Sequence, residues 1–198
     1  MKLHCLLPSL ALAFGAMPVQ AERIDVAVEP GAAKIEWALA GNIHTVHGSF
    51  QLEKGELWFD PETHQAGGLL VVDATTGDSG NGARDSRMHK NVLESARYPK
   101  ITFVPDRIEG AVSVQGASES RLHGQFTIHG ATHEMVMKVT SRIEGGDIDA
   151  TLDFPVPYVK WGMKNPGNFL LRVNDTVDLS IHVAAHVRTR IPPSSGGH

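Results

Sequence analysis

Apolar and polar residues alternate with a period of two along most of this chain, and that pattern limits the fold more than any other feature. In residues 121–130, Leu122, Phe126 and Ile128 fall on one face, while His123, Gln125, Thr127 and His129 fall on the other. Successive side chains of a strand point to opposite faces of a sheet, so such a segment predicts a strand with one buried face. The same alternation occurs in residues 34–40, 55–60, 100–104, 134–139, 149–156 and 175–186.

Short segments rich in Gly, Pro, Asp and Asn separate these runs. The sequences LEKGE, IEGA, HGATH and EGGD each lie between two alternating runs, at the spacing expected of hairpin turns. Strands do not alternate with helices, and no internal repeat is present. About eight strands joined by hairpins predict an all-β fold, with one antiparallel sheet closed into a barrel or folded into a sandwich. The length of 198 residues predicts a single domain.

The chain begins with the three parts of a secretory signal peptide. A basic residue precedes an apolar run that is too short to cross a membrane, and Val19 and Ala21 occupy the small-residue positions of a cleavage site. We therefore predict a signal peptide over residues 1–21 and a folded domain over 22–187. Residues 188–198, rich in Pro, Ser and Gly, are predicted to form a disordered tail.

Composition indicates an exported protein without disulfides. The single cysteine, Cys5, lies before the predicted cleavage site, so we expect the protein in the periplasm or outside the cell. The whole chain has 18 basic and 22 acidic side chains. No stretch concentrates Lys and Arg enough to predict nucleic acid or an anionic membrane surface as the main partner, and stable membrane insertion is not expected.

Residues 80–98 interrupt the strand pattern and predict one short helix. Asn81 or Ser79 is a suitable N-cap, and Asp85 falls in the first turn, where the helix dipole favours an acidic side chain. An apolar stripe follows at helical spacing, at Met88, Val92 and Ala96. The residue before Pro99 avoids the helical conformation, so the helix should end there. A lone amphipathic helix in a barrel is expected to lie across one open end or along the wall.

Catalytic motifs are absent from the sequence. It contains no Gly-x-Ser-x-Gly elbow, no cysteine after the predicted cut and no Gly-rich phosphate loop before a helix. We therefore predict a protein that is not an enzyme and has no catalytic residues.

Eleven histidines leave a second hypothesis open, a His-dependent metal-binding or stress-response protein. His44 and His47 are three apart on a strand and point to opposite faces. His129 and His133 flank a predicted hairpin turn, and with His89 and His64 they are the candidates for a zinc or copper site. None of these spacings is diagnostic, so no metal site is predicted.

The interior of the predicted barrel offers a third feature. An eight-stranded barrel either just fills with side chains or holds one small apolar ligand. If the interior is filled, the third hypothesis is a protein-interaction module.

Residues 154–173 are irregular, with Tyr158, Trp161, Met163 and Phe169 among three prolines. We expect this segment to pack as a cover over an open end of the barrel, because aromatic rings bury a large apolar area.

Four motifs in order resemble those of the YceI family of exported lipid-binding proteins: Gly48-x-Phe50, Arg84-Asp85, Tyr98-Pro99-x-Ile101-x-Phe103 and Thr127-Ile128-x-Gly130-x-Thr132. The resemblance covers residues 24–187 and implies an eight-stranded lipocalin-like antiparallel barrel with the short helix near its mouth. It also implies a cavity for a long isoprenoid or quinone-like lipid. One departure is that Arg87-Met88 stands where the family commonly has His-Leu, with His89 one position later.

We accordingly predict a protein that binds, and transports or stores, a long apolar lipid without transforming it and without any other cofactor. A homodimer is left open. The residues expected to line the cavity are Trp37, Leu39, Phe50, Phe59, Phe103, Phe126, Ile128, Met135, Met137, Leu152 and Phe154, with Arg84 and His89 at the mouth.

Overall fold

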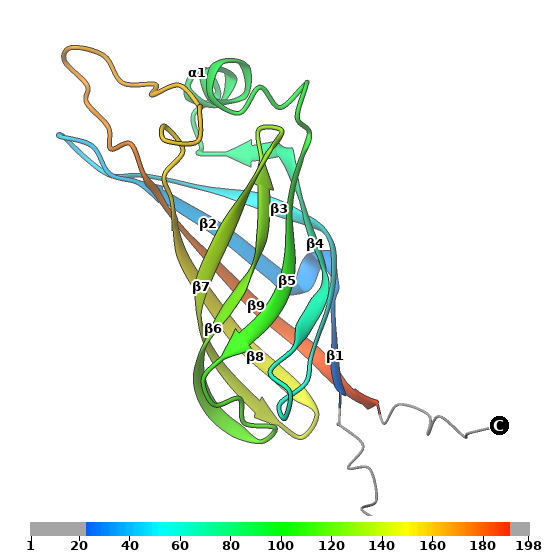
Figure 1. Ribbon diagram of the computed structural model, residues 1–198. Helices are drawn as coiled ribbons and strands as arrows, with labels where there is room; N and C mark the ends of the chain where they lie inside the picture. Colours follow the sequence, from blue (N-terminus) through cyan, green and yellow to red (C-terminus); the bar gives the residue numbers. More distant parts are fainter. Residues whose placement is uncertain (1–22, 191–198) are drawn as a thin grey trace, which may run out of the picture.

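The computed structural model describes residues 23–190, so the predicted signal peptide with Cys5 and the last eight residues lie outside the described range. Nine strands form one antiparallel sheet (Figure 1). They are β1 (Arg23–Val28), β2 (Ala33–Leu39), β3 (Val46–Phe59), β4 (Ala66–Asp78), β5 (Lys100–Glu109), β6 (Gly116–Ile128), β7 (Ala131–Glu144), β8 (Asp147–Val156) and β9 (Val177–Arg190).

The sheet closes on itself as a barrel with eight strand positions. β1 and β2 occupy one position in succession, since both pair with β3 on one side and β9 on the other. A 3₁₀ turn, Pro30–Ala32, separates them, and its proline has no N–H to donate to a neighbouring strand. Pairing of β3 with β4 completes the ring. The predicted eight-stranded antiparallel barrel is therefore confirmed.

Period-two alternation places the core as predicted. Along β7, Met135, Met137 and Val139 are buried, while Val136 and Lys138 between them are exposed. Leu122 of β6 pairs with Met137, so the inward faces of neighbouring strands meet at the same level. Buried side chains from all nine strands form one continuous hydrophobic cluster inside the barrel.

The short helix is present, but it ends earlier than predicted. α1 (Gly82–Arg87) begins at Asn81, whose side chain accepts a hydrogen bond from the Arg84 N–H at 3.1 Å. The chain continues as a π-helical turn, Met88–Val92, closed by the bond from the Leu93 N–H to the Met88 carbonyl at 2.9 Å. Glu94 then adopts a left-handed conformation with φ 46°, which terminates the helix before Ala96 and Pro99.

Three segments far apart in the sequence gather at one end of the barrel (Figure 1). They are the helical segment between β4 and β5, the β2–β3 turn (residues 40–45), and the cover segment (residues 157–176) between β8 and β9. The described chain ends lie at the opposite end of the barrel, where β9 continues to Arg190, three residues past the predicted domain boundary. Within residues 23–190, no helix is long and apolar enough to cross a membrane.

Candidate functional site

A cavity of about 410 Å³ lies inside the barrel at the end where these three segments meet. Its wall is formed by inward-facing apolar side chains of β2, β3, β5, β6, β8 and β9. They are Trp37, Leu39, Val46, Phe50, Ile101, Phe126, Ile128, Val156, Val177 and Leu179. The volume falls in the range of about 300–1,000 Å³ that is typical of sites for a single small ligand.

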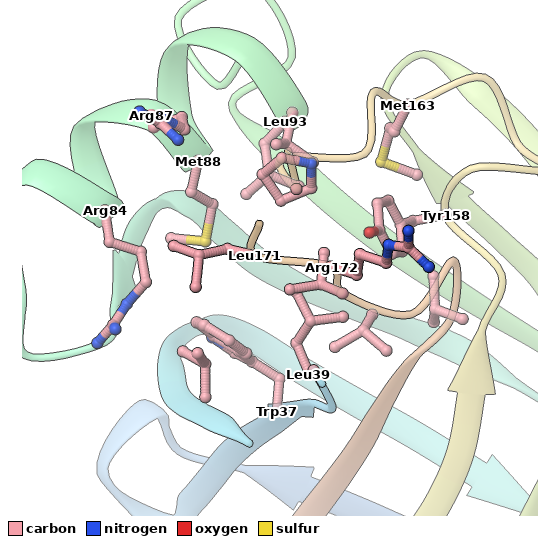
Figure 2. A pocket seen from close by; sticks show the side chains of 18 of the residues that line it. Trp37, Leu39, Arg84, Arg87, Met88, Leu93, Tyr158, Met163, Leu171 and Arg172 are labelled. Carbon is pink, nitrogen blue, oxygen red and sulfur yellow. The ribbon is translucent and has the colours of Figure 1, made fainter. Parts of the chain in front are cut away.

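The helix and the cover segment form the roof of the cavity (Figure 2). The π turn brings Met88, Val92 and Leu93 of the helical segment onto the side that faces the barrel, and all three line the cavity. From the cover segment, Tyr158, Met163 and Leu171 line it as well. Figure 2 shows Met88 and Leu93 reaching from the helix into the same space that Trp37 and Leu39 enter from β2.

Two aromatic contacts fix the cover segment. The Tyr158 hydroxyl donates to the Asn174 carbonyl at 2.7 Å, and burial together with the charge of Asp175 raises the pKa of Tyr158 to about 12. Trp161 stacks on His133 of β7, with ring centroids 4.1 Å apart and planes 3° from parallel. Tyr158 and Met163 are buried, as expected of a cover, but the prediction is wrong for Phe169, which is 87% exposed.

The rim of the cavity is basic. Arg84, Arg87 and Arg172 are the charged side chains in the lining, which contains no carboxylate. Arg84 donates from Nε to the Ser79 hydroxyl at 2.7 Å and from Nη2 to the Ser79 carbonyl at 2.8 Å. The guanidinium groups of Arg87 and Arg172 form no hydrogen bond or ion pair with any residue in the range 23–190. They are therefore free to meet the polar end of a ligand.

The Arg84-Asp85 motif stabilises the turn before the helix. The Asp85 carboxylate accepts hydrogen bonds from the Ser79 N–H at 3.0 Å and from the Ser79 hydroxyl. Burial alone would raise the pKa of Asp85, but these hydrogen bonds and the positive charge of Arg84 outweigh it and hold the pKa below its ordinary value. Both members of the motif converge on Ser79, so their first role is structural.

His89 attaches the helix to the barrel. Its Nε2 lies 2.9 Å from the Gly77 carbonyl, and its Nδ1 lies 3.0 Å from the Ser95 hydroxyl. A carbonyl only accepts, so Nε2 donates to Gly77, and Nδ1 shares a hydrogen bond with the Ser95 hydroxyl. His89 does not line the cavity, although the sequence analysis placed it at the mouth.

The structure divides the residues predicted to contact ligand into two groups. Those that line the cavity are Trp37, Leu39, Phe50, Arg84, Phe126 and Ile128. Those that do not, besides His89, are buried in the filled core: Phe59, Phe103, Met135, Met137, Leu152 and Phe154. All inward side chains of a strand share one face, so alternation does not distinguish an empty level of the barrel from a filled one.

Several lining residues were missed by the sequence analysis. They are Arg87, Met88, Leu93, Ile101, Val156, Tyr158, Met163, Leu171 and Arg172. Two signals pointed to some of them: the apolar stripe at Met88, and the irregular aromatic run of the cover segment. The histidines, by contrast, are dispersed. Within residues 23–190, no three His, Asp or Glu side chains gather into a group suited to a metal ion.

A closed antiparallel barrel with one apolar cavity under a helical roof defines a lipocalin-like ligand-binding protein. The chain belongs to the YceI family, since residues 27–185 match the YceI-like domain. Curated relatives described as UPF0312 proteins, from Pseudomonas savastanoi pv. phaseolicola and Pseudomonas syringae pv. syringae, are 33% identical over 104 residues, or 52% of this chain and of each relative. The chain thus matches about half the length of these relatives.

Solved structures share the fold at low sequence identity. BcnA of Burkholderia cenocepacia aligns with a TM-score of 0.64 and 19% identity, covering 80% of this chain and 99% of that one. A polyisoprenoid binding domain from Saccharophagus degradans aligns with a TM-score of 0.62 and 14% identity, covering 82% and 98%. A YceI protein of Campylobacter jejuni aligns with a TM-score of 0.52 and 14% identity, covering 94% and 98%.

Proposed function

We propose that this protein binds one long apolar lipid of the isoprenoid type in the periplasm and carries or stores it without transforming it. The observation on which the proposal rests is the apolar cavity under the helical roof. The lipid-binding character of the family and the polyisoprenoid binding domain of Saccharophagus degradans support this class of ligand. Export rests on the predicted signal peptide, which lies outside the described residues.

Burial of the lipid tail supplies the affinity. Each methylene removed from water contributes about 0.8 kcal/mol before the cost of ordering the chain is subtracted. In our proposal the tail packs against Trp37, Phe126 and Ile128, and its inner end stops where the filled core begins. Arg87 and Arg172 at the rim then meet the polar end, which sets the direction in which the lipid is bound.

The lining supports binding without chemistry. It contains no Ser, Thr, Cys, Lys, Asp or Glu, so His44, the one histidine of the lining, has no acidic or nucleophilic partner among the lining residues. Tyr158 stays neutral at physiological pH because its pKa is about 12. The filled-barrel hypothesis requires an interior without a cavity, and the space at the mouth argues against it.

Native mass spectrometry of the protein purified from its own periplasm, followed by organic extraction and lipid analysis, tests the proposal. We expect near one lipid per chain. A Val46→Trp variant fills the cavity from β3 and should retain less lipid, whereas Val136→Trp places the same ring on the outer face of β7 and should retain it all. A bare protein that also fails to take up added isoprenoid, or a bound metal mass, would contradict the proposal.

A further inference from the structure

The rim of the cavity carries a cluster of exposed apolar side chains, which we call the apolar tip: Ile43, Phe169, Leu170 and Leu171. Their exposed fractions are 68%, 87%, 75% and 48%. Single exposed apolar residues are common on protein surfaces, but a contiguous group indicates an interaction surface. Phe169 was predicted to pack against the core, but in the structure its side chain is exposed.

Hydrogen bonds hold the two parts of the apolar tip together. The Asn42 N–H donates to the Arg172 carbonyl at 3.0 Å, and the Asn42 side chain accepts from the Arg172 N–H at 3.0 Å and donates to the Leu170 carbonyl at 3.2 Å. The Asn168 side chain accepts from the N–H groups of Leu170 and Leu171 at 2.9 and 2.8 Å. These N–H and C=O groups already have hydrogen-bond partners within the loops. They therefore need no water, which is absent from an apolar environment such as lipid.

The two segments that roof the cavity, one of which carries most of the apolar tip, are rich in basic side chains. The helical segment between β4 and β5 and the cover segment together contain seven Lys and Arg and three Asp and Glu, although the whole chain is acidic. Lys160 and Lys164 are exposed in the cover segment, and the guanidinium groups of Arg87 and Arg172 lie at the rim without partners among residues 23–190. These positions are far apart in the sequence, which is why no basic stretch was evident before the fold was known.

We propose that the apolar tip docks the barrel mouth onto the surface of an anionic lipid bilayer. Phe169 and Leu170 enter the boundary between headgroups and acyl chains, while the Lys and Arg of the two roof segments contact anionic headgroups. Ile43 and Leu171 line the cavity as well as the tip, so the docked face is continuous with the cavity. This docking goes beyond the proposed lipid binding and does not require that the ligand be an isoprenoid.

Co-sedimentation of the purified protein with vesicles tests the docking. Vesicles of phosphatidylcholine mixed with phosphatidylglycerol should bind the protein, and vesicles of phosphatidylcholine alone should bind it more weakly. The double variant Phe169→Ser with Leu170→Ser should lower partitioning about tenfold or more, because two large apolar side chains no longer leave water. Lys160→Gln with Lys164→Gln should lower binding to the anionic vesicles only, and added salt should have the same effect on the wild type.

The matched control is Val104→Ser with Val114→Ser, two exposed apolar residues that do not line the cavity, and it should bind like the wild type. Unchanged melting temperatures show that each variant is folded. Docking is overturned if the wild type ignores anionic vesicles, or if the Phe169 and Leu170 variant binds them as well as the control does. A wild-type dimer that this variant abolishes, without vesicle binding, would assign the apolar tip to a protein interface instead.

The two proposals fail separately. Phe169 and Leu170 lie outside the cavity lining, so their double variant should carry the same mass of bound lipid as the wild type when lipid is supplied in solution. Loss of vesicle binding with retained lipid supports docking. Absence of lipid from every form of the protein would count against the proposed function and leave docking to be judged by the vesicles alone.

Discussion

At the scale of single residues, the shape of the cavity wall depends on a glycine, Gly48, which has no side chain. Trp37 of β2 pairs with Gly48 of β3, and the indole ring lies directly over the glycine. A Cβ atom at residue 48 would overlap this ring and the carbonyl oxygen of Asp78. In the Gly48-x-Phe50 motif, Gly48 thus provides the flat surface on which the Trp37 ring packs, and Phe50 lines the cavity beside Trp37.

Gly48→Ala should therefore lower the free energy of unfolding by about 1–3 kcal/mol, the usual cost of forcing an extra group into a packed site. The displaced Trp37 should also reduce the amount of lipid retained. Urea unfolding and lipid analysis measure the two effects. Gly31→Ala is the control, since nothing lies within 4 Å of a Cβ there, and its effect should stay within about 0.5 kcal/mol. Equal stability of the two variants would contradict the close packing of Trp37 on Gly48.

Tyr158 gives a second prediction at this scale. Its pKa of about 12 in the folded protein exceeds the ordinary value near 10, because burial and the charge of Asp175 disfavour the phenolate. The chain has two tyrosines, so Tyr98→Phe leaves Tyr158 as the sole signal in a titration of tyrosinate absorbance. We expect a midpoint near 12. A midpoint near 10 would show that the Tyr158 hydroxyl is not buried against Asn174.

The same shift in pKa determines how the contribution of Tyr158 to stability changes with pH. Tyr158 is neutral in the folded and the unfolded chain below pH 10, so the contribution of its burial to stability is complete there. Between about pH 10 and 12 the unfolded chain loses this proton first. The contribution is therefore lost as the pH rises through that window.

At the scale of elements, the roof depends on a helix that is too short to be stable alone. α1 with its π turn owes its position to contacts with the barrel: Met88 and Val92 face inward, and His89 bonds to Gly77 at the end of β4. Sequence periodicity predicted the inward positions of Met88 and Val92, but Ala96 lies beyond the helix and is exposed. Of the two predicted caps, Asn81 and Ser79, the structure uses Asn81. Periodicity did not predict the π turn or the left-handed Glu94, because both depend on how Leu93 fits under the roof and not on local propensity.

His89→Ala should loosen this helix. The variant leaves the buried Ser95 hydroxyl and the Gly77 carbonyl without their partner, which costs about 1–3 kcal/mol for such groups. Amide hydrogen exchange over residues 82–93 should rise sharply, while exchange in β6 and β7 stays slow. Lys90→Ala, an exposed position in the same turn, is the control. Equal protection of the helix in both variants would refute the attachment through His89.

At the scale of the whole molecule, the barrel combines a filled base with an open mouth. Hydrophobic alternation predicted an antiparallel barrel or sandwich and its inward residues, because every strand of either fold has one buried face, and the family resemblance implied the closed barrel. Alternation does not show whether an inward residue lies near the mouth or near the base of the barrel. Leu152 and Leu39 therefore have the same pattern in the sequence, although Leu152 is buried in the core and Leu39 lines the cavity. The apolar tip forms only when the β2–β3 turn meets the cover segment, a contact between residues more than a hundred positions apart.

This division into base and mouth predicts that stability and ligand binding respond to different residues. Met137 is fully buried in the base, so Met137→Ala should cost about 2–5 kcal/mol of unfolding free energy and leave lipid affinity nearly unchanged. Leu39 is half-buried in the cavity wall, so Leu39→Ala should cost less stability but weaken lipid binding several-fold, at about 0.8 kcal/mol for each lost methylene contact. Chemical unfolding and lipid titration of both variants measure the two quantities. If Met137→Ala weakens lipid binding as strongly as Leu39→Ala does, the lipid tail reaches the base of the barrel, and the filled core must open to admit it.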